Sequence, residues 1–191
     1  MFKKKANMGA NTINYNEEVL KGGFIVSGVS ILLTMIIYII DIEMLVSGWF
    51  GFVSFILSIG ILIYIGRSYR DATGGYMTYK NSLIFTYLVL VVSYVVGSLF
   101  NILLYNVIDP SLTEVVTELT IQNTIPMLES FGTPQEAIDA AVIEIEKGVE
   151  QQATPMGIIK ATPWALLFML IFALIVSIFV KKNEPVSDRM N

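Results

Sequence analysis

Four long stretches of the sequence contain no charged residue, and they constrain the possible folds more than any other feature. The stretches are residues 22–40, 44–66, 81–108 and 161–180. Each is close to or longer than the ~20 residues that a helix needs to cross the hydrocarbon core of a bilayer. A single Asp, Lys or Arg at the centre of such a helix costs about 2.5–3.5 kcal/mol on insertion scales. The exclusion of charge therefore predicts four transmembrane helices.

The overall composition agrees with lipid as the solvent. The chain is 54% hydrophobic and 15% charged, whereas soluble domains carry roughly 25% charged residues. Its net charge of −4 offers no basic field that could release counterions from phosphates, so nucleic acid is not expected as a partner. Cys and His are both absent, which removes the thiolate nucleophile, the commonest general base and the commonest transition-metal ligands. We expect no catalytic residue, no metal site and no cofactor.

The basic residues predict the orientation of the four helices. Of the 12 Lys and Arg residues, all but Lys147 and Lys160 lie before the first stretch, between the second and third, or after the fourth. The positive-inside rule assigns these segments to the cytoplasm. Trp49 and Trp164 then fall at the opposite interface, where indole rings favour the headgroup layer. We expect a multi-pass protein whose N and C termini are both cytoplasmic.

The polar region between the third and fourth stretches is predicted to form a helical hairpin outside the membrane. Residues 109–160 contain nine acids and two lysines. Apolar residues recur there at helical spacing in two segments, which are separated by a break at Phe131 and Gly132. Two amphipathic helices in sequence can cover their apolar faces by folding back on each other, or they can lie on the outer membrane surface or on a partner. In the positive-inside orientation this acidic hairpin is extracytoplasmic.

Capping patterns predict where the helices of this region begin. We expect the first hairpin helix to begin at Asp109, with a capping box formed by Ser111 and Glu114. Thr133, followed by proline and then by glutamate three residues on, is expected to cap the second hairpin helix. Thr162, also followed by proline, repeats the pattern at the start of the fourth span.

The acids of this region are spread along helix faces rather than gathered in a loop. Calcium sites need oxygen ligands at short spacing in a turn, as in the EF-hand. Glu146 and Glu150 are one helical turn apart, which is also the spacing of an ordinary solvated face. The prediction is a solvated acidic surface. Whether this surface binds a cation, a partner or only solvent stays open from the sequence.

Three basic residues in the second connection are candidates for contact with a lipid headgroup or a partner. These are Arg67, Arg70 and Lys80. Each can contribute about 1 kcal/mol of attraction to an anionic lipid surface. The same residues also satisfy the positive-inside rule without any further role. Both interpretations stay open.

Small residues recur at intervals of four on three of the predicted spans, and they are candidates for helix packing. They are Gly23 and Ser27 on the first span, Ser54 and Ser58 on the second, and Ser93, Gly97 and Asn101 on the third. Such rows let helix backbones approach closely in lipid, and an Asn can add an interhelical hydrogen bond of roughly 0.6–2 kcal/mol. The rows fit packing within the bundle and association with another membrane protein equally well.

Short motifs at the two ends of the third span resemble a known bacterial membrane family. The motifs are YRD at residues 69–71, GGYMTY at 74–79 and YNVIDP at 105–110. Together with four spans and an acidic insert before the last, they resemble the uncharacterised family catalogued as domain of unknown function 4199 over nearly the whole chain. The resemblance implies a bacterial inner-membrane protein, typically from the Bacteroidota, often encoded beside a family-two glycosyltransferase that resembles polyprenyl-phosphate sugar transferases. It implies no catalytic residues.

We therefore expect an all-α membrane protein, a four-transmembrane-helix bundle with an extracytoplasmic amphipathic helical hairpin between the third and fourth helices. The expected division is a cytoplasmic segment 1–21, three spans in 22–108, the insert 109–160, the fourth span 161–180 and a cytoplasmic tail 181–191.

The expected function is that of a non-enzymatic accessory or scaffold subunit of a bacterial inner-membrane complex. Besides membrane lipids, its partner would be another integral membrane protein, for which the resemblance suggests the glycosyltransferase, or a second copy of the chain. The spans hold none of the ionisable side chains that proton relays and ion pathways use. One alternative is a component of a transporter or flippase for a lipid-linked substrate. Another is a membrane enzyme that binds a lipid headgroup through its basic second connection.

Overall fold

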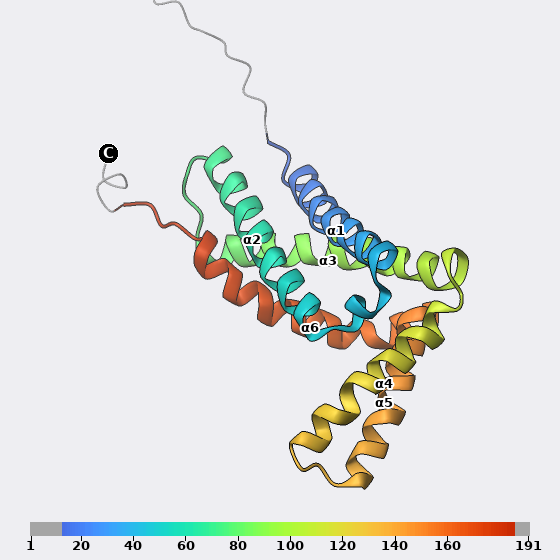
Figure 1. Ribbon diagram of the computed structural model, residues 1–191. Coiled ribbons are helices and arrows are strands. Elements are labelled where there is room, and N and C mark those ends of the chain that lie inside the picture. Colours follow the sequence, from blue (N-terminus) through green and yellow to red (C-terminus); the bar gives the residue numbers. More distant parts are fainter. Residues whose placement is uncertain (1–12, 186–191) are drawn as a thin grey trace, which may run out of the picture.

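The computed structural model describes residues 13–185, which form six α-helices and two short helical segments (Figure 1). The elements are α1 (Tyr15–Ile40), the 3-10 helix η1 (Ile42–Val46), α2 (Gly48–Ala72), α3 (Tyr79–Leu103), the π-helix η2 (Leu104–Ile108), α4 (Leu112–Ser130), α5 (Gln135–Ala153) and α6 (Pro155–Val180). Four of them, α1, α2, α3 with η2, and α6, are long and apolar enough to cross a membrane. The prediction of four spans with two shorter helices before the last is confirmed.

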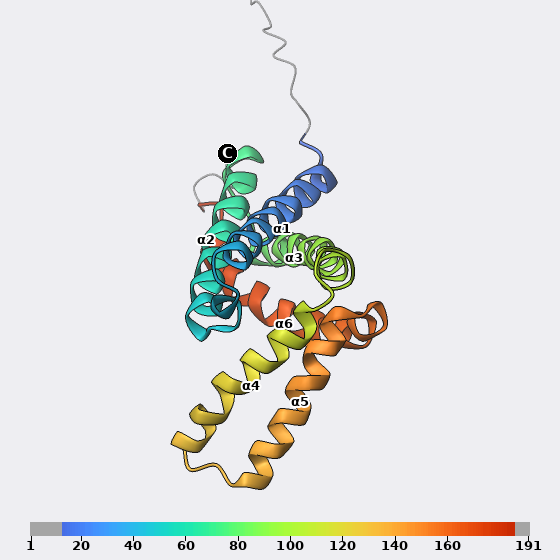
Figure 2. The ribbon, with the colours of Figure 1, turned by 45° about the vertical axis from the view of Figure 1, so that its right-hand side comes forward.

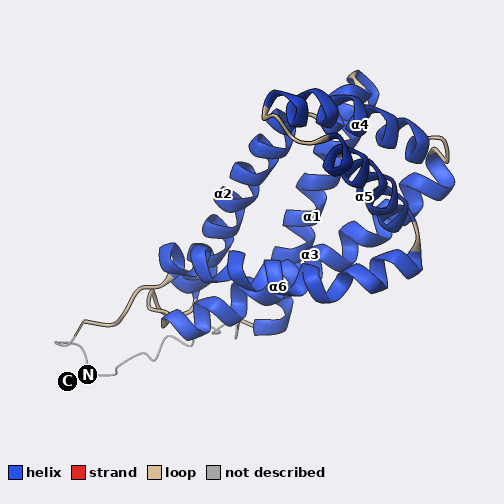
Figure 3. Ribbon diagram, turned by 90° about the horizontal axis from the view of Figure 1, so that it is seen from below, coloured by secondary structure: helices blue, strands red, loops and turns tan. Residues whose placement is uncertain are grey.

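The helix α3 is the centre of the bundle. It packs against α1 and against α6, while α2 packs on α6 and α1 (Figures 1 and 2). The largest buried side chains that these four helices share include Leu62, Phe85, Val89 and Val176. This core lies where α1 begins and α6 ends, and we call that the terminal end. The opposite end, which carries α4 and α5, is the hairpin end (Figure 3).

Glycines allow the close helix contacts at the terminal end. A Cβ atom added to Gly66 of α2 would lie 2.7 Å from a methyl carbon of Val180 in α6. A Cβ atom added to Gly23 of α1 would overlap the side chain of Val92 in α3. The backbones of these helices can therefore approach only because no side chain stands between them, as is typical of helix packing in lipid.

The helices α4 and α5 form an antiparallel hairpin that projects from the bundle, and we call it the arm (Figures 1 and 2). Their apolar faces meet, so that Ile138 and Val149 of α5 are buried. The turn lies at Phe131 and Gly132, and Gly132 has a φ of 70°, a conformation that favours glycine. The predicted hairpin and its break are confirmed.

Ser111 is the N-cap residue of α4, as predicted, but the expected capping-box hydrogen bond is absent, and the predicted N-cap of α5 is wrong. Ser111 precedes α4 but makes no side-chain cap, because its hydroxyl donates to the carboxylate of Asp109 at 2.5 Å. The same carboxylate accepts the backbone N–H of Ser111 at 3.1 Å, so Asp109 replaces the expected capping box. The helix α5 follows Pro134 as N-cap and has no side-chain cap, so Thr133 does not act as one.

The fourth span begins earlier than predicted. Thr154 is the N-cap of α6, and its hydroxyl accepts the backbone N–H of Gly157 at 3.2 Å. Pro163 therefore lies inside the helix, and the predicted start at Thr162 is wrong. The hydroxyl of Thr162 donates to the carbonyl of Ile158 at 2.8 Å.

Candidate functional site

Arg67 and Arg70, in the last turns of α2, both reach the C-terminus of α6. The Nε atom of Arg67 donates to the carbonyl of Phe179 at 3.1 Å, and an Nη atom of Arg70 donates to the carbonyl of Val180 at 2.9 Å. The last carbonyls of a helix have no partner within it, and cations there complement the negative end of the helix dipole. The two guanidinium groups therefore cap α6.

The third basic candidate, Lys80, does not join Arg67 and Arg70 at the C-terminus of α6. Its side chain is exposed and makes no hydrogen bond or ion pair with the residues that the structure describes. Arg70 is by contrast only 13% exposed, and it also pairs with Asp71 at 2.9 Å. Two of the three predicted contact residues thus have partners within the protein, and Lys80 alone faces outward without one.

The connection between α2 and α3 is tied to the chain that follows α6. Gly74 and Gly75 have φ angles of 112° and 81°, so the chain can reverse direction there. Met77 and Lys182 then exchange two backbone hydrogen bonds, at 2.8 and 2.9 Å. This pairing fixes the connection against the terminal end of the bundle.

Aromatic and basic side chains alternate around this pairing. The Nζ atom of Lys181 lies 5.7 Å from the ring centroid of Tyr79, and that of Lys182 lies 5.4 Å from the ring centroid of Tyr76. Both distances are within the range of cation–π attraction. The hydroxyl of Tyr79 also donates to the carbonyl of Leu174 at 3.0 Å. The basic chain after α6 is thus held on the aromatic part of the connection.

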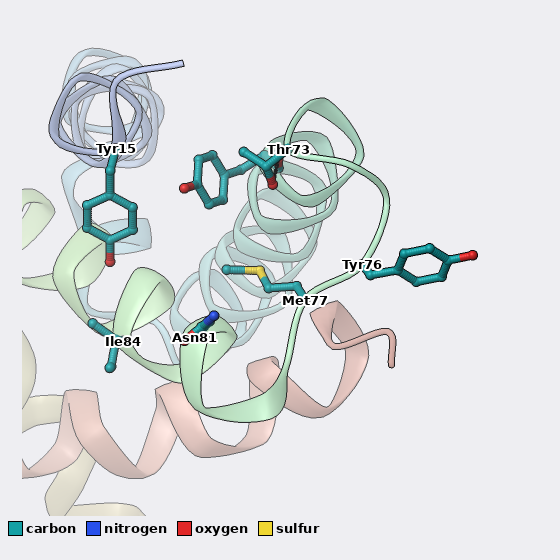
Figure 4. Close-up of a pocket in the computed structure, with 7 residues that line it drawn as sticks. Tyr15, Thr73, Tyr76, Met77, Asn81 and Ile84 are labelled. Carbon is teal, nitrogen blue, oxygen red and sulfur yellow. Dashed lines mark hydrogen bonds between the residues drawn. The ribbon is translucent and has the colours of Figure 1, made fainter. Parts of the chain in front are cut away.

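A cavity of about 520 Å³ lies beside this connection (Figure 4). It is lined by Tyr15, Tyr69, Thr73, Tyr76, Met77, Asn81 and Ile84. The ring centroids of Tyr15 and Tyr69 are 5.9 Å apart in an edge-on arrangement, and Tyr69 stacks on Phe85 at 4.3 Å. In Figure 4 the Met77 side chain extends into the space while the Tyr76 ring points away from it. No lining residue is charged, so this cavity suits an apolar or neutral hydrogen-bonding group.

The small residues Gly23 and Ser27 of α1 lie on the side of the helix that faces α3. Gly23 is buried against Val92 of α3. Ser27 is also buried, and its hydroxyl donates to the carbonyl of Gly23 at 2.9 Å. These two positions therefore belong to the contact between α1 and α3.

The two serines of α2 are half-buried. The hydroxyl of Ser58 donates to the carbonyl of Ser54 at 2.8 Å. The hydroxyl of Ser54 is buried and has no hydrogen-bond partner among the described residues. The row therefore presents one unpaired hydroxyl in the hairpin half of α2.

The three small or polar residues of α3 line a space between α1 and α3, which we call the groove. It has a volume of about 270 Å³. Its lining residues are Ser27, Ser30, Ile31, Thr34, Ser93, Tyr94, Gly97, Ser98, Phe100 and Asn101. A Cβ atom added to Gly97 would meet nothing within 4 Å, unlike one added to Gly23. In the hairpin half, α1 and α3 are therefore separated by open space.

A second space, which we call the chamber, lies at the base of the arm and measures about 330 Å³. Its lining residues are Thr34, Leu45, Val46, Phe50, Asn101, Leu104, Tyr105, Leu112, Val116, Thr120, Val149 and Gln152. Thr34 and Asn101 line both the chamber and the groove.

The acids of the arm do not converge. Among residues 13–185, no three His, Cys, Asp or Glu side chains come together as metal ligands would. Glu146 and Glu150 are exposed on the outer face of α5. The acid with the most hydrogen-bond partners is Asp109. Donors from Ser111, and then from the Tyr38 hydroxyl at 2.9 Å, hold the pKa of its carboxyl below the ordinary value.

Comparison with known families places the chain. The profile of a family described as protein of unknown function (DUF4199) matches residues 21–182. The chain belongs to the DUF4199 family. No curated protein and no solved structure matches it.

The DUF4199 match contains nearly every residue described above. Arg67, Arg70, Lys80, the groove and the chamber lie inside it, whereas Tyr15 of the terminal cavity precedes it. The family description states no activity.

Two residues of these cavities were not singled out from the sequence. Tyr15 stands in the first turn of α1, which Asn14 caps by accepting the backbone N–H of Asn16 at 3.1 Å. The capping pattern of Asn14 with Glu17 three residues on was the available signal. Thr34 follows Ser27 and Ser30 at helical spacing, so the available signal for Thr34 was a polar stripe on the first span.

Proposed function

We propose that this DUF4199 protein is a non-enzymatic accessory subunit that binds another integral membrane protein through its arm. The observation that carries the proposal is the exposed apolar tip of a projecting hairpin. Phe131 is 79% exposed and Met127, one helical turn before it, is 52% exposed. Phe and Met are enriched at the cores of protein interfaces. The tip therefore offers an aromatic anchor for a partner.

The attachment of the arm supports this role. Its base contacts α3, α6 and η1, while the rest extends away from the bundle (Figures 1 and 2). The acids Glu129 and Glu136 beside the tip are exposed. A helical hairpin held at one end can place its tip against a second protein without disturbing the four spans.

The charges support an orientation with the arm in the periplasm of a bacterial inner membrane. At the terminal end lie Lys21, Arg67, Arg70, Lys80, Lys181 and Lys182. By the positive-inside rule this end is cytoplasmic. The further basic residues of the prediction, Lys3, Lys4, Lys5 and Arg189, lie outside the described residues. The family resemblance suggests a family-two glycosyltransferase as the partner.

The two alternative functions have less support from the geometry. An enzyme that grips a headgroup with the second connection would need Arg67 and Arg70, yet both cap α6. A transporter needs a polar path across the bilayer. The groove lies in the hairpin half, and in the terminal half α1 and α3 close on each other at Gly23 and Val92. The packing therefore favours an accessory role.

Photocrosslinking in cells tests the proposal. A benzophenone amino acid at Phe131 should crosslink to one membrane protein at native expression. The same amino acid at Glu144, whose side chain is 75% exposed on α5, is the matched control and should give little of that product. Adducts with lipid only, or equal adducts at both positions, would contradict the proposal.

Co-purification provides the quantitative test. The exchange Phe131→Ser should reduce the amount of co-purified partner at least tenfold, because an aromatic anchor at an interface contributes 2 kcal/mol or more and 1.4 kcal/mol is a factor of ten. The unfolding temperature in detergent should stay unchanged, since the ring is exposed. A partner retained in full by the variant would show that the tip is not the docking site.

A further inference from the structure

Several polar side chains that line the groove have unused hydrogen-bonding capacity, and two of them, Thr34 and Asn101, also line the chamber. Thr34, Ser93, Ser98 and Asn101 make no side-chain hydrogen bond with any described residue. Ser30 lines the same groove, but its hydroxyl donates to the carbonyl of Val26 in its own helix at 3.0 Å. These groups lie within α1 and α3, where the bilayer supplies no water to satisfy them. A polar group that faces hydrocarbon without a hydrogen-bond partner costs free energy, so the cavities favour a hydrogen-bonding occupant.

The charge around the cavities restricts that occupant. No Asp, Glu, Lys or Arg lines the groove or the chamber. A phosphate would therefore meet no cation, and an ammonium group would meet no carboxylate. Asp41 and Glu43 line a neighbouring surface cavity at the hairpin end and add negative charge there. An anionic headgroup is disfavoured, and an uncharged group is favoured.

The apolar part of the lining indicates that the occupant is amphipathic. Ile31 and Phe100 face the groove, and Phe50 and Leu104 face the chamber. Volumes of about 270 and 330 Å³ are at the lower limit of ligand pockets, which usually measure ~300–1,000 Å³. Because Thr34 and Asn101 line both spaces, a ligand that spans them places polar atoms on these two side chains.

We infer that the groove and chamber bind an uncharged membrane lipid, with its hydroxyl-bearing head on Thr34 and Asn101 and its chain on the apolar walls. The groove lies within two of the spans, so such a ligand can reach it from the bilayer. This inference is independent of the accessory function, because it uses none of the residues at the tip of the arm.

A glycine substitution tests the site without disturbing the packing. A Cβ atom at Gly97 meets nothing within 4 Å, so Gly97→Leu should fill the groove while the fold is kept. Gly28 of α1 also has open space around it and does not line the groove. Gly28→Leu is therefore the matched control, with the same gain in helix propensity.

The binding assay is native mass spectrometry of the full chain in mild detergent. The probes are monoglucosyl diacylglycerol, phosphatidylglycerol with the same acyl chains, and free glucose. We expect retention of the uncharged glycolipid over phosphatidylglycerol. Gly97→Leu should reduce this retention at least tenfold, whereas Gly28→Leu should leave it unchanged. Neither exchange should lower the unfolding temperature.

A second variant tests the hydrogen bonds themselves. The double exchange Thr34→Val with Asn101→Leu keeps the number and branching of the side-chain heavy atoms and removes their hydrogen-bonding groups, so it should also lower retention about tenfold. Equal retention by both variants and the natural chain would overturn the inference. So would a preference for phosphatidylglycerol, or no retention of the glycolipid. Binding of free glucose as strong as that of the glycolipid would show that the ligand is a soluble sugar and would overturn the lipid assignment.

Discussion

At the scale of single residues, two glycines of similar sequence context have opposite surroundings. Gly23 on α1 lies directly against Val92, whereas Gly97 on α3 borders the open groove. Both belong to rows of small residues, and the rows alone predict the same packing role for each. The difference arises because α1 and α3 approach closely in the terminal half and separate in the hairpin half.

Alanine at each position should separate the two roles. Gly23→Ala forces a methyl group into Val92, and overpacking of this kind usually costs about 1–3 kcal/mol. Gly97→Ala should be neutral or stabilise by up to ~1 kcal/mol through helix propensity. Thermal unfolding in detergent measures both. If the Gly23→Ala protein were as stable as the natural chain, α1 and α3 could move apart at this contact at little cost in free energy.

At the scale of elements, some helix ends are determined by local sequence patterns and others by tertiary contacts. The start of α6 has two candidates with the same Thr-Pro pattern, at Thr154 and Thr162, and the structure uses the earlier one. The charge-free stretch suggested the later one because Lys160 lies between them. A membrane helix can extend beyond the hydrocarbon core, so the absence of charge defines the buried part of the helix and not its end.

The end of α6 depends on another element. Its carbonyls at Phe179 and Val180 are capped by arginines of α2. Replacing both Arg67 and Arg70 by Gln should lower the free energy of unfolding by about 1–3 kcal/mol, as loss of hydrogen bonds to charged groups does. Lys80→Gln is the matched control and should have little effect. Unfolding in detergent provides the measurement. If the double arginine variant were as stable as the Lys80→Gln control, the two arginines would not stabilise the end of α6.

At the scale of the whole molecule, the orientation in the membrane is directly testable because the chain contains no cysteine. Cysteine at Ser130, in the exposed last turn of α4, should react with an impermeant thiol reagent from the periplasm. Cysteine at the exposed Asn183, after α6, should react only once the membrane is opened. The reverse pattern would place the arm in the cytoplasm.

The sequence by itself determined the number of spans, the helical hairpin before the last span, its break at Phe131 and Gly132, and the family. These features depend on local chemistry, namely the absence of charge over membrane-spanning lengths, apolar periodicity and the conformational freedom of glycine. They are visible because each depends only on residues close together in the chain.

The tertiary structure alone decided which polar residues have partners. The arginines of the second connection reach carbonyls of α6, Asp109 accepts from Tyr38 and not only from its own turn, and Asn101 faces a cavity instead of a neighbouring helix. These outcomes depend on how α1, α2 and α6 are arranged around α3. Side chains far apart in sequence meet only through that arrangement, and small-residue rows are compatible with several such arrangements.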